Sequence, residues 1–251
     1  MEIGFNLYSI RNQVQTADQL RDAFVRLKGM GYEAVQFSGT NYDPELLRTL
    51  SAEVALPVVL THMPLERLLH DRDGLIREHE RFGCRNIGLG MMPGEIASDD
   101  ERVKKLTEEL EDCAVYLKKF GFTLYYHNHS FEFRHMAGQT VYDYLIENTS
   151  ALCFVPDTYW LQHGGVNIVE YIHKLKGRCA CAHLKDYAME GWTPRYAPVG
   201  EGNIDFVQVL KELAAAGTRH YIVEQDNATE SPDPFGEAYK SVSFLKKIQL
   251  G

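Results

Sequence analysis

The stretch TLYYHNH at residues 123–129 contains the unit from which the fold is predicted: a short apolar run that ends in polar side chains. A longer charged segment, at about residues 99–120, precedes it, and its apolar residues recur with the spacing of an amphipathic helix. A short strand next to a helix is the building unit of α/β proteins. We therefore look for the same unit along the rest of the chain.

The unit recurs eight times without a linker. Strands are predicted at residues 3–7, 34–37, 57–61, 86–90, 123–126, 152–155, 179–182 and 221–223. Helices are expected from about 18, from 43, and at about 65–82, 99–120, 140–147, 168–176, 205–216 and 234–250. Strict alternation implies parallel strands with helices outside. Eight units in 251 residues predict an α/β fold, a (β/α)8 or TIM barrel, as a single domain over residues 1–251.

An open doubly wound sheet is the main alternative to a closed barrel. Such a sheet normally carries a glycine-rich phosphate loop after its first strand. Here the corresponding residues 6–11 read NLYSIR and contain no glycine, so a dinucleotide-binding sheet is disfavoured.

Composition excludes several classes of function. The net charge of −9 and the lack of a basic stripe argue against a nucleic-acid partner. The apolar runs are too short for a membrane span. The five cysteines are odd in number and lack a framework spacing, which favours a reduced cytoplasmic protein.

Polar side chains end most of the predicted strands, and in a TIM barrel the active site lies at these carboxyl ends. They concentrate on the last four strands, where His127, Asp157, His183 and Glu224 follow one another. One such residue is as often a local loop contact as a site residue. Four on neighbouring strands predict a metal site, and mixed imidazole and carboxylate ligands suit Mn²⁺, Zn²⁺ or Co²⁺ better than Ca²⁺.

Six short motifs extend this interpretation to a family resemblance. They are GFNLYSIR at 4–11, YHNHSFEF at 126–133, PDTYW at 156–160, HLKD at 183–186, VGEGNID at 199–205 and VEQD at 223–226. Taken together, they resemble the xylose isomerase-like TIM-barrel superfamily, in its sugar phosphate isomerase/epimerase branch. The resemblance covers essentially the whole chain and does not define a substrate.

The resemblance implies one divalent metal ion (Mn, Zn, Co or Mg, with its identity open) held by a Glu, an Asp, a His and a Glu on strands 5 to 8. Asp157, His183 and Glu224 match three of these positions. Strand 5 departs from the pattern because His127 stands where many relatives have the glutamate. Glu132, five residues later, is the alternative fourth ligand.

The implied reaction is isomerisation or epimerisation of a small sugar or keto-sugar through an enediolate. Glu224 would transfer one proton, and His127 or Glu132 the other. Substrate contacts are expected from residues of the predicted mouth: His62, His129, Trp160, Lys185 and Glu201. Two of these have plain structural alternatives: Lys185 could pair with Asp186, and Glu201 could cap the next helix. The long loop that carries Trp192 and Arg195 could act as a lid.

Three other functions remain alternatives. A metal-dependent lyase, such as a keto-inositol dehydratase or a 3-keto-glycoside eliminase, would share the enolate, and an imidazole in the strand-5 cluster could protonate its leaving oxygen. A repair nuclease of the same superfamily would need more metal ligands and a basic surface. A non-catalytic sugar-binding barrel would have lost its metal. The expected partner is a small sugar, and a homo-oligomer is an open alternative.

Overall fold

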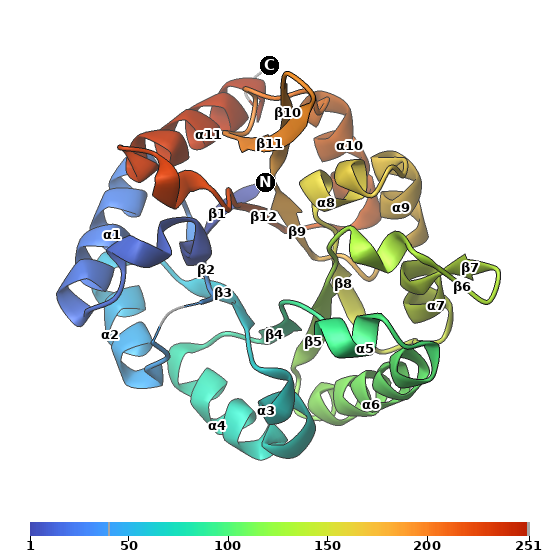
Figure 1. Cartoon of the computed structure of the whole chain (residues 1–251). Coiled ribbons are helices and arrows are strands. Elements are labelled where there is room, and N and C mark those ends of the chain that lie inside the picture. The colour runs from blue at the N-terminus through green and yellow to red at the C-terminus, as the bar shows by residue number, and fades with distance from the viewer. Residues whose placement is uncertain (40, 250–251) are drawn as a thin grey trace.

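The computed structural model describes residues 1–39 and 41–249. Eight parallel strands form a nearly closed barrel with the helices around it (Figure 1), so the predicted TIM barrel is confirmed. The barrel strands are β1 Glu2–Asn6, β2 Ala34–Phe37, β3 Val58–His62, β4 Asn86–Leu89, β5 Thr123–His127, β8 Cys153–Val155, β9 Cys181–Leu184 and β12 His220–Val223.

The barrel closes between β8 and β9, the two ends of the strand order β8-β5-β4-β3-β2-β1-β12-β9. Only a short seam joins them: a parallel bridge pairs Asp157 with His183, and the His183 N–H donates to the Pro156 carbonyl at 3.0 Å. The seam therefore brings two of the predicted metal ligands side by side.

The helices cover the outside of the barrel. They are α1 Ala17–Met30, α2 Pro44–Val54, α3 Leu65–His70, α4 Arg72–Phe82, α5 Gly94–Ala97, α6 Asp100–Lys118, α7 Val141–Glu147, α8 Thr158–His163, α9 Ile168–Lys174, α10 Phe206–Ala216 and α11 Pro234–Gln249. Short 3-10 turns follow three of the strands: η1 Leu7–Gln13, η2 Phe131–Phe133 and η3 Ala228–Glu230. Several helix starts follow from local sequence: Asp43 caps α2 ahead of Pro44, and Thr16 and Gln19 form a capping box at α1.

Two apolar cores hold the layers together. The larger lies between the strands and the helices. The smaller fills the barrel interior with side chains from alternate strand positions, including Ala34, Leu60, Tyr125 and Cys181. Strand β9 starts two residues later than predicted, and Cys179, which precedes it, packs in the larger core whereas Cys181 packs in the barrel interior.

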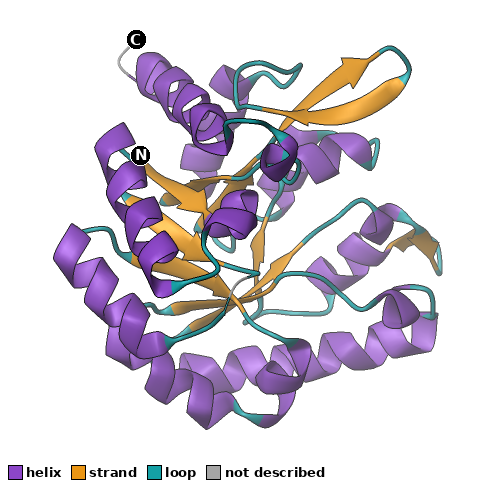
Figure 2. Ribbon diagram, turned by 60° about the vertical axis from the view of Figure 1, so that its left-hand side comes forward, coloured by secondary structure: helices purple, strands orange, loops and turns teal. Residues whose placement is uncertain are grey.

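The segment that the sequence presented as a long loop is a β-hairpin. Strands β10 Asp186–Glu190 and β11 Thr193–Ala197 form an antiparallel ribbon that projects beyond the barrel strands (Figure 2). Gly191 turns the chain at its tip with a positive φ, beside the almost fully exposed Trp192. A second small ribbon pairs β6 His135–Met136 with β7 Gln139–Thr140. Within the described ranges, no helix is both long enough and apolar enough to span a membrane.

Candidate metal centre and substrate cavity

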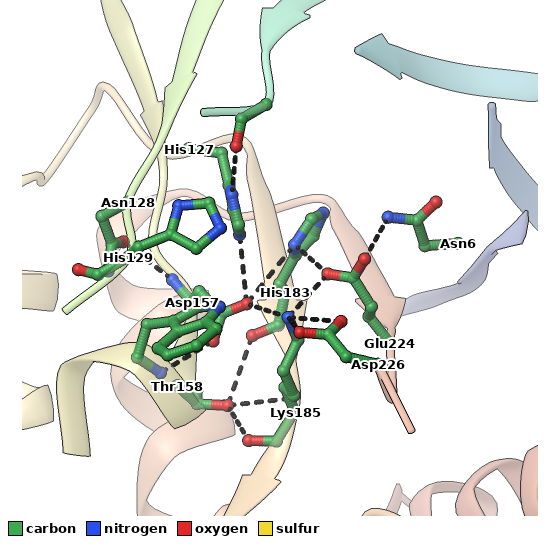
Figure 3. A network of polar contacts seen from close by, with 12 residues as sticks. Asn6, His127, Asn128, His129, Asp157, Thr158, His183, Lys185, Glu224 and Asp226 are labelled. Carbon is green, nitrogen blue, oxygen red and sulfur yellow. Dashed lines mark hydrogen bonds and ion pairs between the residues drawn. The ribbon is translucent and has the colours of Figure 1, made fainter. Parts of the chain in front are cut away.

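Four residues from four barrel strands or strand ends converge at the barrel mouth (Figure 3). His127, Asp157, His183 and Glu224 each offer one ligand atom, and these atoms all lie within 4.8 Å of one another. All four residues are buried. The strands therefore bring together the four side chains that the sequence placed in one cluster.

The two carboxylate oxygens of Asp157 have different partners. Oδ1 accepts a hydrogen bond from the Trp160 N–H at 2.9 Å and so caps helix α8. Oδ2 points to the cluster, 3.1 Å from His127 Nε2 and 3.5 Å from His183 Nδ1. The Asn128 side chain accepts from the Asp157 N–H at 3.0 Å and fixes the backbone at this point.

The two imidazoles are each oriented by the ring nitrogen that faces away from the cluster. His127 Nδ1 donates to the Gly90 carbonyl at 2.9 Å, and His183 Nε2 donates to Gln36 Oε1 at 2.7 Å. Because an oxygen acceptor needs an N–H opposite it, His127 Nε2 and His183 Nδ1 are the nitrogens available to a metal ion.

Glu224 is held from the neighbouring strand, because β1 pairs with β12. Asn6 on β1 donates from Nδ2 to Glu224 Oε1 at 2.8 Å, which leaves Oε2 facing the cluster. Oε2 lies 2.8 Å from His183 Nδ1, but this approach lacks hydrogen-bond geometry, and Nδ1 has no hydrogen-bond partner in the described part of the chain. A buried ring nitrogen without a hydrogen-bond partner indicates a place where a group that accepts its electron pair, such as a metal ion, would bind.

Lys185 contributes a buried ammonium group to the same cluster. Its Nζ lies 3.0 Å from Glu224 Oε2, 3.2 Å from Asp157 Oδ2 and 3.0 Å from Asp226 Oδ1. The Trp160 ring flanks it at 5.5 Å. Asp186 makes no contact with this ammonium, so the pairing with Asp186 that the sequence offered as an alternative is replaced by pairing with Asp226.

These contacts set the protonation of the cluster. Burial by itself would raise the pKa of the Asp157 and Glu224 carboxyls, but the Lys185 ammonium and the neighbouring imidazoles outweigh it and hold both pKa values well below the usual range. Burial would likewise lower the pKa of Lys185, but the surrounding carboxylates hold it well above its usual value. Both carboxylates are therefore ionised and able to bind a cation.

The donor set fits a metal ion. Two imidazole nitrogens with their far N–H groups engaged and two ionised carboxylates are the ligands that Zn²⁺, Mn²⁺, Co²⁺ and related ions accept in proteins. Asn6, Gln36 and the Gly90 carbonyl form the supporting hydrogen bonds that such sites use to fix their ligands.

A cavity of about 440 Å³ opens beside this cluster, within the range of small-molecule sites. Its polar side consists of His62, His127, His129, Lys185, Glu224 and Asp226. The rest of the lining includes apolar residues at the end of β4, at the start of α3 and in the loops after β3 and β4: Met63, Pro64, Leu65, Leu89, Met91 and Pro93.

His62 enters this cavity because β4 makes room for it. A Cβ atom added to Gly88 or Gly90 would lie within 3.0 Å of the His62 ring. Gln36 Nε2 donates to His62 Nε2 at 3.2 Å. Glycine therefore stands at position 88 within β4 and at position 90 just after it, because the imidazole from β3 occupies the space of a side chain there.

His129 and Trp160, both predicted to contact substrate, lie beside the cluster with their rings 5.0 Å apart. His129 Nδ1 and Trp160 Nε1 are buried and have no hydrogen-bond partner among residues 1–39 and 41–249. Burial, followed by the charges of His127 and Lys185, lowers the pKa of His129 to about 3, so its ring is neutral.

Glu132 and Glu201 lie apart from the cluster. The Glu132 carboxylate is buried outside the barrel interior, where it accepts from the Tyr126 hydroxyl at 2.7 Å and the His129 N–H at 2.9 Å. Glu201 lies on the surface and pairs with Lys240 of α11 at 3.4 Å. Neither residue lines the cavity, so only His127 supplies the strand-5 donor to the cluster.

Three further polar residues, Asn6, Gln36 and Asp226, lie at or near the ends of predicted strands, and no role was predicted for them. In the structure the first two orient Glu224 and His183, and the third pairs with Lys185. Tyr196 of β11 had no sequence signal at all, and its ring lies 5.7 Å from Lys185 Nζ. Only the folding of the hairpin brings it there.

An eight-stranded parallel barrel with a His/Asp/Glu cluster at the carboxyl ends of its strands defines the class, a TIM barrel with a potential metal centre at its mouth. Residues 24–248 match the profile of the xylose isomerase-like TIM barrel family, and the chain belongs to this family. No curated protein matches the chain in sequence.

Solved structures share the fold at low sequence identity. A sugar phosphate isomerase/epimerase from Parabacteroides distasonis is 19% identical with a TM-score of 0.78, covering 97% of this chain and 92% of that one. A D-allulose 3-epimerase from Methylomonas sp. is 16% identical with a TM-score of 0.71, covering 99% and 98%. A xylose isomerase-like TIM barrel protein from Mycobacterium smegmatis, solved with magnesium, is 14% identical with a TM-score of 0.74, covering 98% and 96%.

Proposed function

We propose that this protein is a divalent-metal-dependent isomerase or epimerase of a small sugar or keto-sugar. The observation that carries the proposal is the buried set of His127, Asp157, His183 and Glu224 beside a cavity of sugar-binding size. Solved proteins with the same fold include sugar isomerases and epimerases, which supports the same class of reaction.

These four residues would hold one divalent ion, which supplies polarisation of a substrate carbonyl and stabilisation of the negative charge that forms on its oxygen. Mn, Zn, Co and Mg all remain candidates, and Mg is the metal in the Mycobacterium smegmatis structure. Asn6 and Gln36 keep the ligands in place, and Lys185 limits the repulsion between the carboxylates.

Glu224 is the carboxylate we propose as the base that removes a proton next to the carbonyl. It is ionised and lines the cavity. His127 approaches from the adjacent side of the cluster, and Nε2 is its one free nitrogen, so it can be the partner in proton transfer only when it does not bind the ion. Glu132 does not line the cavity, so we assign it a positioning role: its carboxylate holds the His129 backbone.

Loading with Mn²⁺ tests the proposal. The protein purified without chelator should contain about one metal ion per chain, and added Mn²⁺ should raise the melting temperature of the chelator-treated protein. Incubation with keto-sugars in D2O should then place deuterium on a carbon next to the carbonyl. Failure to bind any divalent metal would overturn the proposal and favour a barrel that only binds sugar.

A metal-dependent lyase is the second candidate, and the imidazoles of the cavity favour it. His62 and His129 line the cavity in addition to the candidate ligand His127, and the N–H of a neutral imidazole can donate a hydrogen bond to a leaving oxygen. The mass of the product separates the two reactions, because elimination lowers it and isomerisation leaves it unchanged.

A further inference from the structure

The substrate cavity has an apolar wall that no part of the described chain covers. Met91, at the rim, is 57% exposed although it is a large apolar side chain. Leu65 and Pro93 flank it, and Leu89 forms the buried floor. A free sugar presents hydroxyl groups on nearly every carbon and would leave most of this wall in contact with water.

The cavity offers almost no free positive charge. Among its described lining residues, Lys185 is the one lysine or arginine, and Asp226, Asp157 and Glu224 already surround its ammonium group. The charge of a divalent metal ion in the cluster would be balanced by its own ligands Asp157 and Glu224. The charge of Lys185 would then be balanced by Asp226. Neither cation is then left to balance a phosphate dianion.

Arg11 lies behind two cavity-lining residues, Tyr8 and Asp226, and contacts both of them. Its Nη1 donates to the Tyr8 and Asp226 carbonyls, both at 3.0 Å, and its guanidinium stacks on the Tyr8 ring at 4.4 Å. Two main-chain carbonyls and the Tyr8 ring therefore hold one nitrogen and one face of this guanidinium.

The backbone amides of the loop after the seventh strand, which could replace a basic side chain, are occupied as well. In TIM barrels, phosphate commonly binds to the loops after the seventh and eighth strands. Here the loop at Gly200–Gly202, which follows the seventh strand and its hairpin, donates the Gly200 and Gly202 N–H groups to the buried Asp186 carboxylate, each at 2.9 Å. The Tyr187 N–H joins them at 2.8 Å. The protein's own carboxylate therefore fills the anion site of this loop.

From this distribution of charge and apolar surface we propose that the substrate is an uncharged sugar derivative, without phosphate, whose apolar substituent packs on the wall formed by Leu65, Leu89, Met91 and Pro93. This inference rests on the proposed function, because it assumes that the sugar reaches the metal cluster. It names the substrate class that the cavity selects.

Binding measurements on the Mn²⁺-loaded protein test it. The probes are the methyl and phenyl glycosides of glucose, galactose and mannose, the three parent hexoses and their 6-phosphates, titrated by calorimetry. For at least one hexose, the phenyl glycoside should bind about tenfold more tightly than the methyl glycoside, because its ring is removed from water. The 6-phosphates should bind about tenfold more weakly than the parent hexoses, or not at all.

Two methionine variants locate the effect. Met91→Gln should remove most of the preference for phenyl over methyl glycosides. Met189→Gln is the matched control, because Met189 is also exposed but lies on β10 and does not line the cavity. It should keep the full preference. Melting temperatures and Mn²⁺ affinity of both variants should equal those of the wild type, since neither residue contacts the cluster.

The outcomes separate this inference from the proposed function. Tighter binding of a 6-phosphate than of its hexose, or equal binding of phenyl and methyl glycosides, overturns the inference and leaves metal-dependent proton exchange standing. Binding of none of the probes by a protein that does bind Mn²⁺ also overturns it. Failure to bind Mn²⁺ removes the proposed function and this inference together.

Discussion

The two halves of the barrel mouth are built from different chemistry. The ends of β5, β8, β9 and β12 carry His127, Asp157, His183 and Glu224. The ends of β1 to β4 and the loops after them carry neutral amides, one imidazole and an apolar wall. The first half gathers charge where a cation could balance it. The second orients two of the ligands through Asn6 and Gln36 and shapes the cavity. We infer that chemistry and substrate selection are divided between the halves.

The largest effect should follow a change to the charged half. Glu224→Gln keeps the size of the side chain and an oxygen for Asn6 but removes the proposed base. We expect turnover to fall by about 10³-fold, with an unchanged circular dichroism spectrum. The rate of solvent deuterium uptake is the measurement. A variant that turns over at the wild-type rate would exclude Glu224 as the base.

Metal affinity should drop next most strongly in Asp157→Ala, which removes a candidate ligand. The same change also removes the cap of α8 and would cost about 1 kcal/mol of unfolding free energy for that reason alone. Asp43→Ala is the matched control, because Asp43 caps α2 away from the cluster. Elemental analysis should show metal loss in the first variant only. Equal metal content in both would remove Asp157 from the ligand set.

The neutral half should act on the metal centre only through orientation. Gln36→Leu removes the acceptor that fixes His183 Nε2, and Asn6→Ala removes the donor to Glu224. Each should weaken Mn²⁺ binding by about 10- to 100-fold, the usual cost of losing a supporting hydrogen bond at a metal site. Titration of chelator-treated protein measures this. Unchanged affinity in both variants would mean that the ligands are held by the barrel alone.

A smaller and purely thermodynamic effect is expected at Glu132. Burial raises the pKa of this carboxyl to about 7, although hydrogen bonds from Tyr126 and the His129 N–H oppose the shift. An unfolded chain titrates its glutamates near pH ~4.3. Between these values the folded protein retains a proton that the unfolded chain has lost. The contribution of Glu132 is therefore fully present below about pH 4.3 and is lost as the pH rises through about 7, by about 4 kcal/mol.

Glu132→Gln should remove this part of the pH dependence. Urea unfolding at pH 5 and pH 8 measures it. From pH 5 to pH 8 the free energy of unfolding of the variant should rise relative to that of the wild type by up to about 3 kcal/mol. A difference that stays constant with pH would show that Glu132 is ionised in the folded protein at both values.

The smallest effect is expected at Glu201, which lies on the surface and pairs with Lys240. Exposed ion pairs contribute about 0 to 1 kcal/mol. Glu201→Gln should change kcat/KM by less than about twofold and stability by less than about 1 kcal/mol. A larger loss of activity would indicate that Glu201 contacts the substrate, as the sequence motif implied.

Local sequence predicted most of the barrel. Strand Ala34–Phe37 has the predicted bounds, and β5 extends the predicted strand by one residue, His127. The β10–β11 hairpin was not predicted, because its strands are polar and exposed over much of their length and lack the buried alternation of a barrel strand. The choice between His127 and Glu132 as the fourth ligand also needed the structure. Sequence spacing left Glu132 as an alternative, but its carboxylate lies on the outer side of β5 with Tyr126.

The sequence by itself determined the closed barrel and the order of candidate ligands along it. Both follow from short-range patterns, namely apolar runs, helix periodicity and the polar residue that ends each strand. Tertiary structure decided which of these residues meet. The seam between β8 and β9 places Asp157 beside His183, the pairing of β1 with β12 brings Asn6 to Glu224, and packing across the barrel brings Gln36 to His183. Such contacts join residues 147 and 218 positions apart, and no local pattern encodes which side chains the closed barrel will bring within hydrogen-bond reach.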